Sequence, residues 1–137
     1  MSKVIFNLTQ HQPTKEQIEV GVTDRNDEIA ALLNFTTIPT DDEVVERASK
    51  IVYKVVKLRA SKDFDVVLLG DTPFLMGHLE EMFANNNIKT VYAFYERVSV
   101  ETVTTDENEV VNKTNQSKHV GFVKSRATMI HWFNWKP

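Results

Sequence analysis

A strand, a helix and a second strand follow one another within residues 65–94, and this succession constrains the fold more than any other feature. Residues 65–70 (DVVLLG) form a continuous apolar run that ends in glycine, which is typical of a strand buried on both faces. Pro73 suits the first position of the helix that follows, and residues 88–94 (IKTVYAF) form the next strand. Such a unit pairs its strands in parallel through a right-handed crossover, so the sequence predicts an α/β fold.

The residues before this unit supply one more strand and three helices. Val4 to Leu8 is short, apolar and β-branched, as an opening strand should be. Thr14 with Gln17 makes a capping box, so a helix should begin there and end near Gly21. A second helical stretch is expected within residues 24–34, and a second capping box, Thr40 with Glu43, should open the longest helix over about 41–60.

The pattern of apolar and polar residues changes after Arg97. Residues 98–104 alternate between apolar and polar, residues 106–108 suit a turn, and residues 110–112 and 119–123 suit returning strands. The prediction is a Rossmann-like α/β fold: a short parallel sheet flanked by helices, with an appended C-terminal antiparallel β-hairpin. It forms one domain over residues 1–137, with an α/β core at 1–97, a hairpin at 98–125 and an aromatic tail at 126–137.

Composition and missing motifs exclude several function classes. The chain has no cysteine and a formal net charge of -3, which argues against thiolate metal sites and against long nucleic acid as a partner. No apolar run is long enough for a membrane span, so a cytoplasmic protein without a membrane partner is expected. The nucleotide fingerprints GxxxxGK[ST] and GxGxxG, the zinc motif HExxH and the elbow GxSxG are all missing, so neither cofactor nor metal is expected.

Ligands of open α/β sheets bind beyond the carboxyl ends of the strands, where the strand order reverses. Three segments should lie at this edge, residues 9–14, 70–74 and 95–99, and they are rich in groups that hold anions or nucleotides. The candidate ligand-binding residues in and beside these segments are Asn7, Thr9, Gln10, His11, Gly70, Asp71, Thr72, Pro73, Phe74, Arg97 and Ser99.

Each candidate has a chemical role and a plainer alternative. Gly70 would allow close approach of a ligand to a helix amino end, or it is only a turn that precedes a cap at Thr72. Gln10 offers donors and acceptors for a base or a ribose, and His11 could contact a phosphate or move a proton, or both belong to a solvated loop. Arg97 could clamp a phosphate, or it pairs with a nearby carboxylate, and His119 could face Glu101 across the hairpin.

Two stretches carry a family resemblance: IFNLTQHQPTKEQ and LLGDTPFLMGHLEEMFANNNIKTVYAFYERVSVE. They resemble small CRISPR-associated proteins with a CARF-like, ring-nuclease-type Rossmann fold, over most of residues 3–123. The resemblance implies a symmetric dimer that recognises a cyclic nucleotide signal of antiviral defence. Some such proteins cut cyclic oligoadenylate without a metal, whereas virus-borne relatives sequester a signal. The matching positions are Asn7, Thr9, Gln10, His11, Gly70, Pro73, Phe74, Arg97 and Ser99.

Three hypotheses follow. In the first, the chain binds and sequesters a nucleotide-derived second messenger, because neither the opening loop nor the glycine loop offers a lysine for a developing phosphate charge. In the second, it is a metal-independent ring nuclease with His11 as the catalytic acid or base. In the third, Trp132, Phe133 and Trp135 dock on a partner, unless they fold back onto the domain. A homodimer or higher homo-oligomer is expected in the first two.

Overall fold

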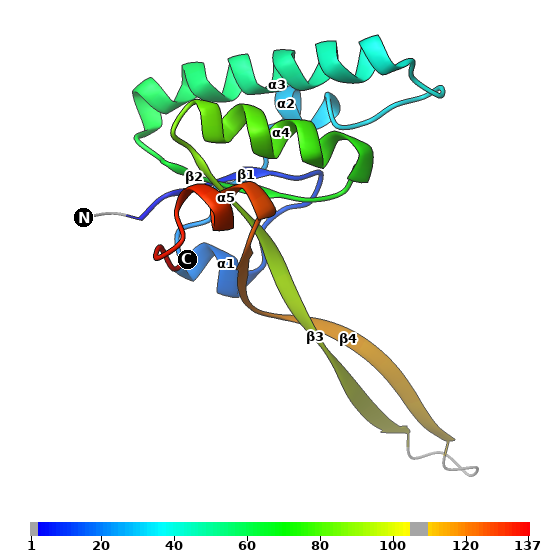
Figure 1. Cartoon of the computed structure of the whole chain (residues 1–137). Coiled ribbons are helices and arrows are strands. Elements are labelled where there is room, and N and C mark those ends of the chain that lie inside the picture. The colour runs from blue at the N-terminus through cyan, green and yellow to red at the C-terminus, as the bar shows by residue number, and fades with distance from the viewer. Residues whose placement is uncertain (1–2, 105–109) are drawn as a thin grey trace.

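The computed structural model describes the backbone of residues 3–104 and 110–137 and the side chains of residues 3–97 and 118–137. A four-stranded sheet is flanked by helices, and the strands lie in the order β1-β2-β3-β4 (Figure 1). Along the chain the elements are β1 (Ile5–Leu8), α1 (Lys15–Glu19), α2 (Asp27–Ala31), α3 (Asp41–Lys62), β2 (Val66–Leu69), α4 (Pro73–Asn85), β3 (Lys89–Thr104), β4 (Val110–Lys124) and α5 (Arg126–His131).

The sheet is mixed rather than purely parallel. β1, β2 and β3 are parallel, with Ile5 opposite Val66 and Val66 opposite Lys89, and β4 is antiparallel to β3. Because successive strands add on the same side and crossovers are right-handed, α3 and α4 lie together on one face (Figure 1). The parallel strands never reverse their order, so the reversal point expected to mark a ligand site is absent.

Each face of the sheet buries its own apolar cluster. Phe6 and Leu8 of β1 and alternate residues of β2 pack against α3 and α4. The other face carries a smaller cluster that includes Ile5, Val66 and Val91, and Trp135 packs against this cluster. All four residues of β2 are buried, as the apolar run at 65–70 predicted.

The predicted starts of the helices are confirmed in large part. Thr14 and Gln17 form the complete capping box of α1. The Thr40 side chain accepts a hydrogen bond from the amide of Glu43 at the start of α3. α1 ends before Gly21, whose φ is +103° and where an added Cβ would lie 1.9 Å from the carbonyl oxygen of Lys3. Only glycine fits this turn without a backbone shift.

β3 runs unbroken through the boundary expected at residue 97, so one strand serves both the parallel sheet and the hairpin. The segment 95–99 is therefore part of a strand and not a loop, contrary to the prediction. His119 pairs with Tyr95, and Glu101 pairs with Lys113, so His119 does not face Glu101. Beyond the Tyr95–His119 pair the two strands project from the body, and this projection is called the arm (Figure 1). The turn predicted at 106–108 lies outside the described residues.

The end of the chain folds back onto the body. Ser125 caps the short helix α5, which the sequence did not predict, by accepting from the amide of Thr128. The ammonium of Lys89 lies 5.2 Å from the ring centroid of Trp132 and 5.4 Å from that of Trp135. Phe133 stays 80% exposed. Within the described part of the chain, no helix is both long and apolar enough to cross a bilayer.

Candidate functional site

A pocket of about 290 Å³ opens at the carboxyl ends of β1 and β2, and β3 forms its third side. It is called the edge pocket. Two of the three predicted segments, 9–14 and 70–74, meet there because parallel strands end at the same edge of a sheet, and the third segment contributes Tyr95. Its lining residues are Thr9, His11, Gln12, Gln17, Leu68, Leu69, Gly70, Asp71, Tyr92, Ala93 and Tyr95.

Buried side chains beneath the pocket shape the loop that follows β1. Asn7 is 2% exposed, and its Nδ2 donates to the carbonyl of His11 at 3.0 Å. The Thr9 hydroxyl donates to Asn7 Oδ1 at 2.7 Å and accepts from the amide of His11 at 3.2 Å. Asn7 therefore holds the loop from below and does not line the pocket, whereas Thr9 and His11 do.

The Asp71 carboxylate joins this loop to the one that follows β2. Its Oδ2 accepts from the amide of Gln10 at 2.7 Å, and its Oδ1 lies 2.9 Å from His11 Nε2. The His11 side chain is 76% exposed and that of Asp71 is 21% exposed, so the imidazole stands at the pocket mouth. Asp71 also takes the positive φ of its loop, 84°, which is a strained conformation for a residue other than glycine.

The loop after β2 differs from its prediction in two ways. Gly70 has no positive φ, and an added Cβ would meet only the Cγ2 of Thr9, at 3.5 Å, so the fold does not require glycine there. Thr72 does not cap α4, because its hydroxyl donates to the carbonyl of Leu33 instead. Thr72, Pro73 and Phe74 do not line the edge pocket, and Phe74 packs edge-on against the ring of Phe35.

A buried amide builds the wall toward the arm. Gln17 is 3% exposed, and its Oε1 accepts from the amide of Thr14 at 2.9 Å. Its Nε2 donates to the Tyr95 hydroxyl at 3.1 Å and lies 3.4 Å from His119 Nδ1. Burial lowers the pKa of His119 below its ordinary value, and the carboxylate of Glu16 opposes the shift in part. The neutral imidazole can accept a hydrogen bond from the Gln17 amide. Gln17 therefore forms hydrogen bonds both at the start of α1 and at the base of the arm.

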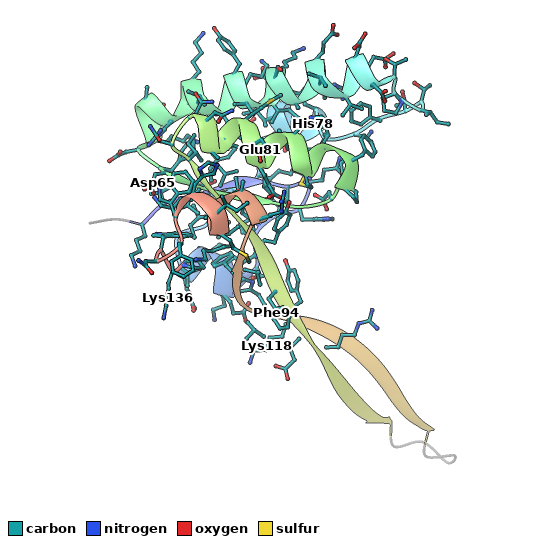
Figure 2. All side chains as sticks on the ribbon, in the orientation of Figure 1. Asp65, His78, Glu81, Phe94, Lys118 and Lys136 are labelled. Atoms are coloured by element: carbon teal, nitrogen blue, oxygen red, sulfur yellow. The ribbon has the colours of Figure 1, made fainter. Side chains whose placement is uncertain are left out.

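The remaining candidates lie elsewhere. Arg97 is exposed on the arm opposite Ser117 and outside the pocket lining, and the side chain of Ser99 lies outside the described residues. Figure 2 shows Phe94 and Lys118 where the arm leaves the body. The Gln10 side chain faces a different cavity. Among the residues that the structure describes, the edge pocket therefore has no lysine or arginine in its lining.

Three polar lining residues were not among the candidates drawn from the sequence: Gln17, Tyr92 and Tyr95. Gln17 was visible only as a helix cap, Tyr92 only as a member of a strand, and Tyr95 only as the first residue of an expected loop. The Tyr92 hydroxyl donates to Glu80 Oε2 at 2.7 Å; burial, followed by this carboxylate, raises the pKa of Tyr92. In the described ranges, no three His, Cys, Asp or Glu side chains gather as a metal site would require.

The comparisons with known proteins give one match. The model of the Uncharacterized protein MJ1673 family matches residues 3–123, which span both loops of the edge pocket and most of the sheet. No curated protein and no solved structure matches the chain significantly.

Proposed function

The chain belongs to the Uncharacterized protein MJ1673 family, and from that premise we propose that its edge pocket binds a nucleotide-derived second messenger and holds it without turnover. The family description assigns no chemistry, so the proposal depends on the site. The observation that carries it is a pocket at the carboxyl edge of parallel strands that combines amide, hydroxyl and aromatic side chains.

These side chains suit a nucleoside. Gln12 is exposed at the pocket, and its amide offers a donor and an acceptor, as the edge of a base requires. Tyr95 is 45% exposed and offers a ring on which a base can stack. The Thr9 hydroxyl and the His11 imidazole lie where ribose hydroxyls could reach them. A volume of about 290 Å³ is at the small end for ligand pockets, so it suits one nucleotide unit.

The charges of the pocket lining favour binding of the messenger without cleavage of its phosphodiester bonds. Phosphodiester cleavage builds negative charge that a positive group must stabilise in the transition state. The described lining of the edge pocket offers Asp71 and His11 but no lysine or arginine. A bound messenger would meet recognition groups without a cation on its scissile phosphate.

The finer fold assignment and the assembly are part of the same proposal. We infer a CARF-like, Rossmann-like core and a homodimer, on the family resemblance of the two stretches described above. A ring of several nucleotides exceeds one edge pocket of about 290 Å³, so two copies would have to share it. The proposed role is the removal of a signal in prokaryotic antiviral defence.

One observation favours a second candidate, the metal-independent ring nuclease. The His11 imidazole is exposed and contacts a carboxylate at 2.9 Å, and such a pair can orient a ring for proton transfer. In that reaction the ribose 2′-oxygen attacks the adjacent phosphorus, its proton passes to a base such as His11, and the bond to the 5′-oxygen breaks as that oxygen takes a proton from water and leaves as a hydroxyl group. The products are linear, with a cyclic phosphate end, and His11→Ala would abolish their formation.

The test mixes excess protein with a panel of cyclic oligoadenylates, cyclic dinucleotides and ADP-ribose-derived signals. After incubation the free ligand is measured, the protein is heat-denatured, and the released material is identified by mass spectrometry. The proposal expects one messenger to leave solution and to return intact. Linear fragments would establish the ring nuclease instead. If every messenger stays free, the edge pocket does not bind this class of ligand and the proposal is wrong.

A further inference from the structure

A second cavity, of about 470 Å³, lies on the other side of the loop that follows β1. Gln10 lines the second cavity, whereas His11 and Gln12 line the edge pocket, so these three consecutive residues form the wall between them. The other lining residues of the second cavity are Arg25, Asp27, Ala30, Ala31 and Asn34. The two cavities are therefore neighbours along the same edge of the sheet.

Arg25 is fixed against this wall and contacts residues of both cavities. Its Nη1 donates to the carbonyl of Gln10 at 2.9 Å, and its backbone amide donates to Gln12 Oε1 at 3.4 Å. Its Nε donates to Asp27 Oδ1 at 3.0 Å. A guanidinium has five N–H donors, and these two side-chain bonds leave the Nη2 group and one Nη1 hydrogen for a ligand. The side chain is 35% exposed, so these donors can be reached from solvent.

We propose that the second cavity binds a phosphate group of the ligand whose nucleoside occupies the edge pocket, with Arg25 as the phosphate-binding residue. This inference rests on the proposed function, because it assumes a nucleoside in the edge pocket. Arg25 is the cation of the second cavity, and a guanidinium with a free edge binds phosphate well. Asp27 pairs with the Nε edge of this guanidinium at 3.0 Å and weakens its positive charge, so a phosphate would bind the Nη2 side of Arg25.

The division of groups between the cavities also explains how a messenger could be held intact. His11 lines the edge pocket and Arg25 lines the second cavity, so the proton-transfer group and the cation are on opposite sides of the wall. Cleavage requires both at one phosphate. Binding requires only that the nucleoside and the phosphate each find their own partner.

The experiment compares ribonucleosides with their 5′-monophosphates by titration calorimetry, using adenosine, guanosine, cytidine and uridine. Wild-type protein should bind the best monophosphate roughly 10-fold or more tightly than its nucleoside, since a hydrogen bond to a charged group contributes that much. Arg25→Gln should bring this ratio near one, and because both affinities are measured in the same variant, a change in nucleoside affinity does not by itself alter the ratio. Ala31→Glu, which puts a negative charge beside the cavity without touching the bonds of Arg25, should reduce the ratio as well.

Arg59→Gln is the matched control. Arg59 also donates to backbone carbonyls, those of Phe64 and Asn86, but it does not line either cavity. It should keep the wild-type ratio, and urea unfolding confirms that each variant is folded. A wild-type ratio of one, or an unchanged ratio in folded Arg25→Gln and Ala31→Glu, overturns the inference and leaves the proposed function in place. If no nucleoside, monophosphate or messenger of the panel binds, the proposed function fails, and the inference fails with it.

Discussion

Asp71 shows how one residue can hold a pocket together at a cost in backbone strain. Its φ of 84° costs about 1–2 kcal/mol for a residue with a Cβ. The hydrogen bonds of its carboxylate with Gln10 and His11 offset this strain. Asp71→Asn tolerates the conformation and keeps one acceptor, so the free energy of unfolding should fall by only about 1 kcal/mol. Asp71→Ala should lower it by about 2–3 kcal/mol in urea titrations, because the carboxylate bonds are lost entirely.

Asp63→Ala separates strain from bonding. Asp63 ends α3 with a φ of 49°, and its exposed side chain forms no hydrogen bond with the residues that the structure describes. Its replacement should lower the free energy of unfolding by about 1 kcal/mol or less. Equal losses in Asp63→Ala and Asp71→Ala would show that the Asp71 carboxylate contributes nothing to the stability of the two loops.

Gly70 gives a residue-scale test of the edge pocket. The backbone there does not need glycine, and an added methyl group would make an ordinary contact with Thr9 and occupy part of the pocket. Gly70→Ala should therefore keep or slightly raise the free energy of unfolding and weaken ligand binding several-fold. Gly77→Ala is the control, since that position in α4 has no atom within 4 Å of the new Cβ. Full affinity in Gly70→Ala would place the ligand elsewhere.

His119 makes the stability of the fold depend on pH. Burial lowers its pKa below the ordinary 6.5, so the folded state resists a proton that the unfolded chain accepts. Above about pH 6.5 the ring is neutral in both states, and stability is lost as the pH falls below that value. His119→Gln should therefore lose less stability than wild type between about pH 7 and pH 5. His78→Gln, at an exposed position on α4, should keep the wild-type slope in urea titrations.

At the scale of elements, Gln17 connects α1 to the base of the arm as well as capping α1. Gln17→Met removes the bonds to Thr14, Tyr95 and His119, and the expected loss is about 2–4 kcal/mol because buried partners are left unsatisfied. Thr14→Ala removes only the cap and should cost about 1 kcal/mol. Urea unfolding of both variants measures the difference. Equal losses would mean that Gln17 acts as a cap and nothing more.

The sequence predicted the elements whose signals are local. The apolar run at 65–70, the capping box of Thr14 and Gln17, and Pro73 at the start of α4 all mark what the structure contains. α5 was not predicted, because it has only six residues and its cap, Ser125, is held by a hydrogen bond to Thr90 of β3, far away in the sequence. The true length of β3 was not predicted either, because alternation after Arg97 looks the same in a new strand as in a continued one.

The edge pocket was predicted only where it consists of loops. Thr9, His11, Gly70 and Asp71 follow strands directly, so a rule about sheet edges finds them. Gln17 and Tyr95 reach the pocket from a helix and from a strand that the sequence did not place beside each other. Arg97 illustrates the converse error. The sequence predicted a loop from Tyr95 onward, and such a loop would place Arg97 near the pocket. In the structure the strand continues and Arg97 lies on the arm.

At the scale of the whole molecule, the arm and the body are separable. Among the residues whose side chains the structure describes, those that line the edge pocket all come before residue 96, and the apolar clusters include none between Ala93 and Phe122. Replacing residues 98–116 by Asn-Gly would keep the Arg97–Ser117 pair and close it with a two-residue hairpin turn. This shortened chain should stay folded and bind the nucleoside with wild-type affinity, as urea unfolding and calorimetry would measure.

The same variant tests the proposed dimer. A two-stranded ribbon that projects from a domain has two free edges along which a second chain can pair. If the arm joins two copies, light scattering should find the full-length chain as a dimer and the shortened chain as a monomer. A shortened chain that stays dimeric would assign the contact to the body. A folded monomer that still binds the nucleoside but no longer binds the messenger would mean that two edge pockets must face each other to hold the messenger, which supports a ligand shared across the two-fold axis.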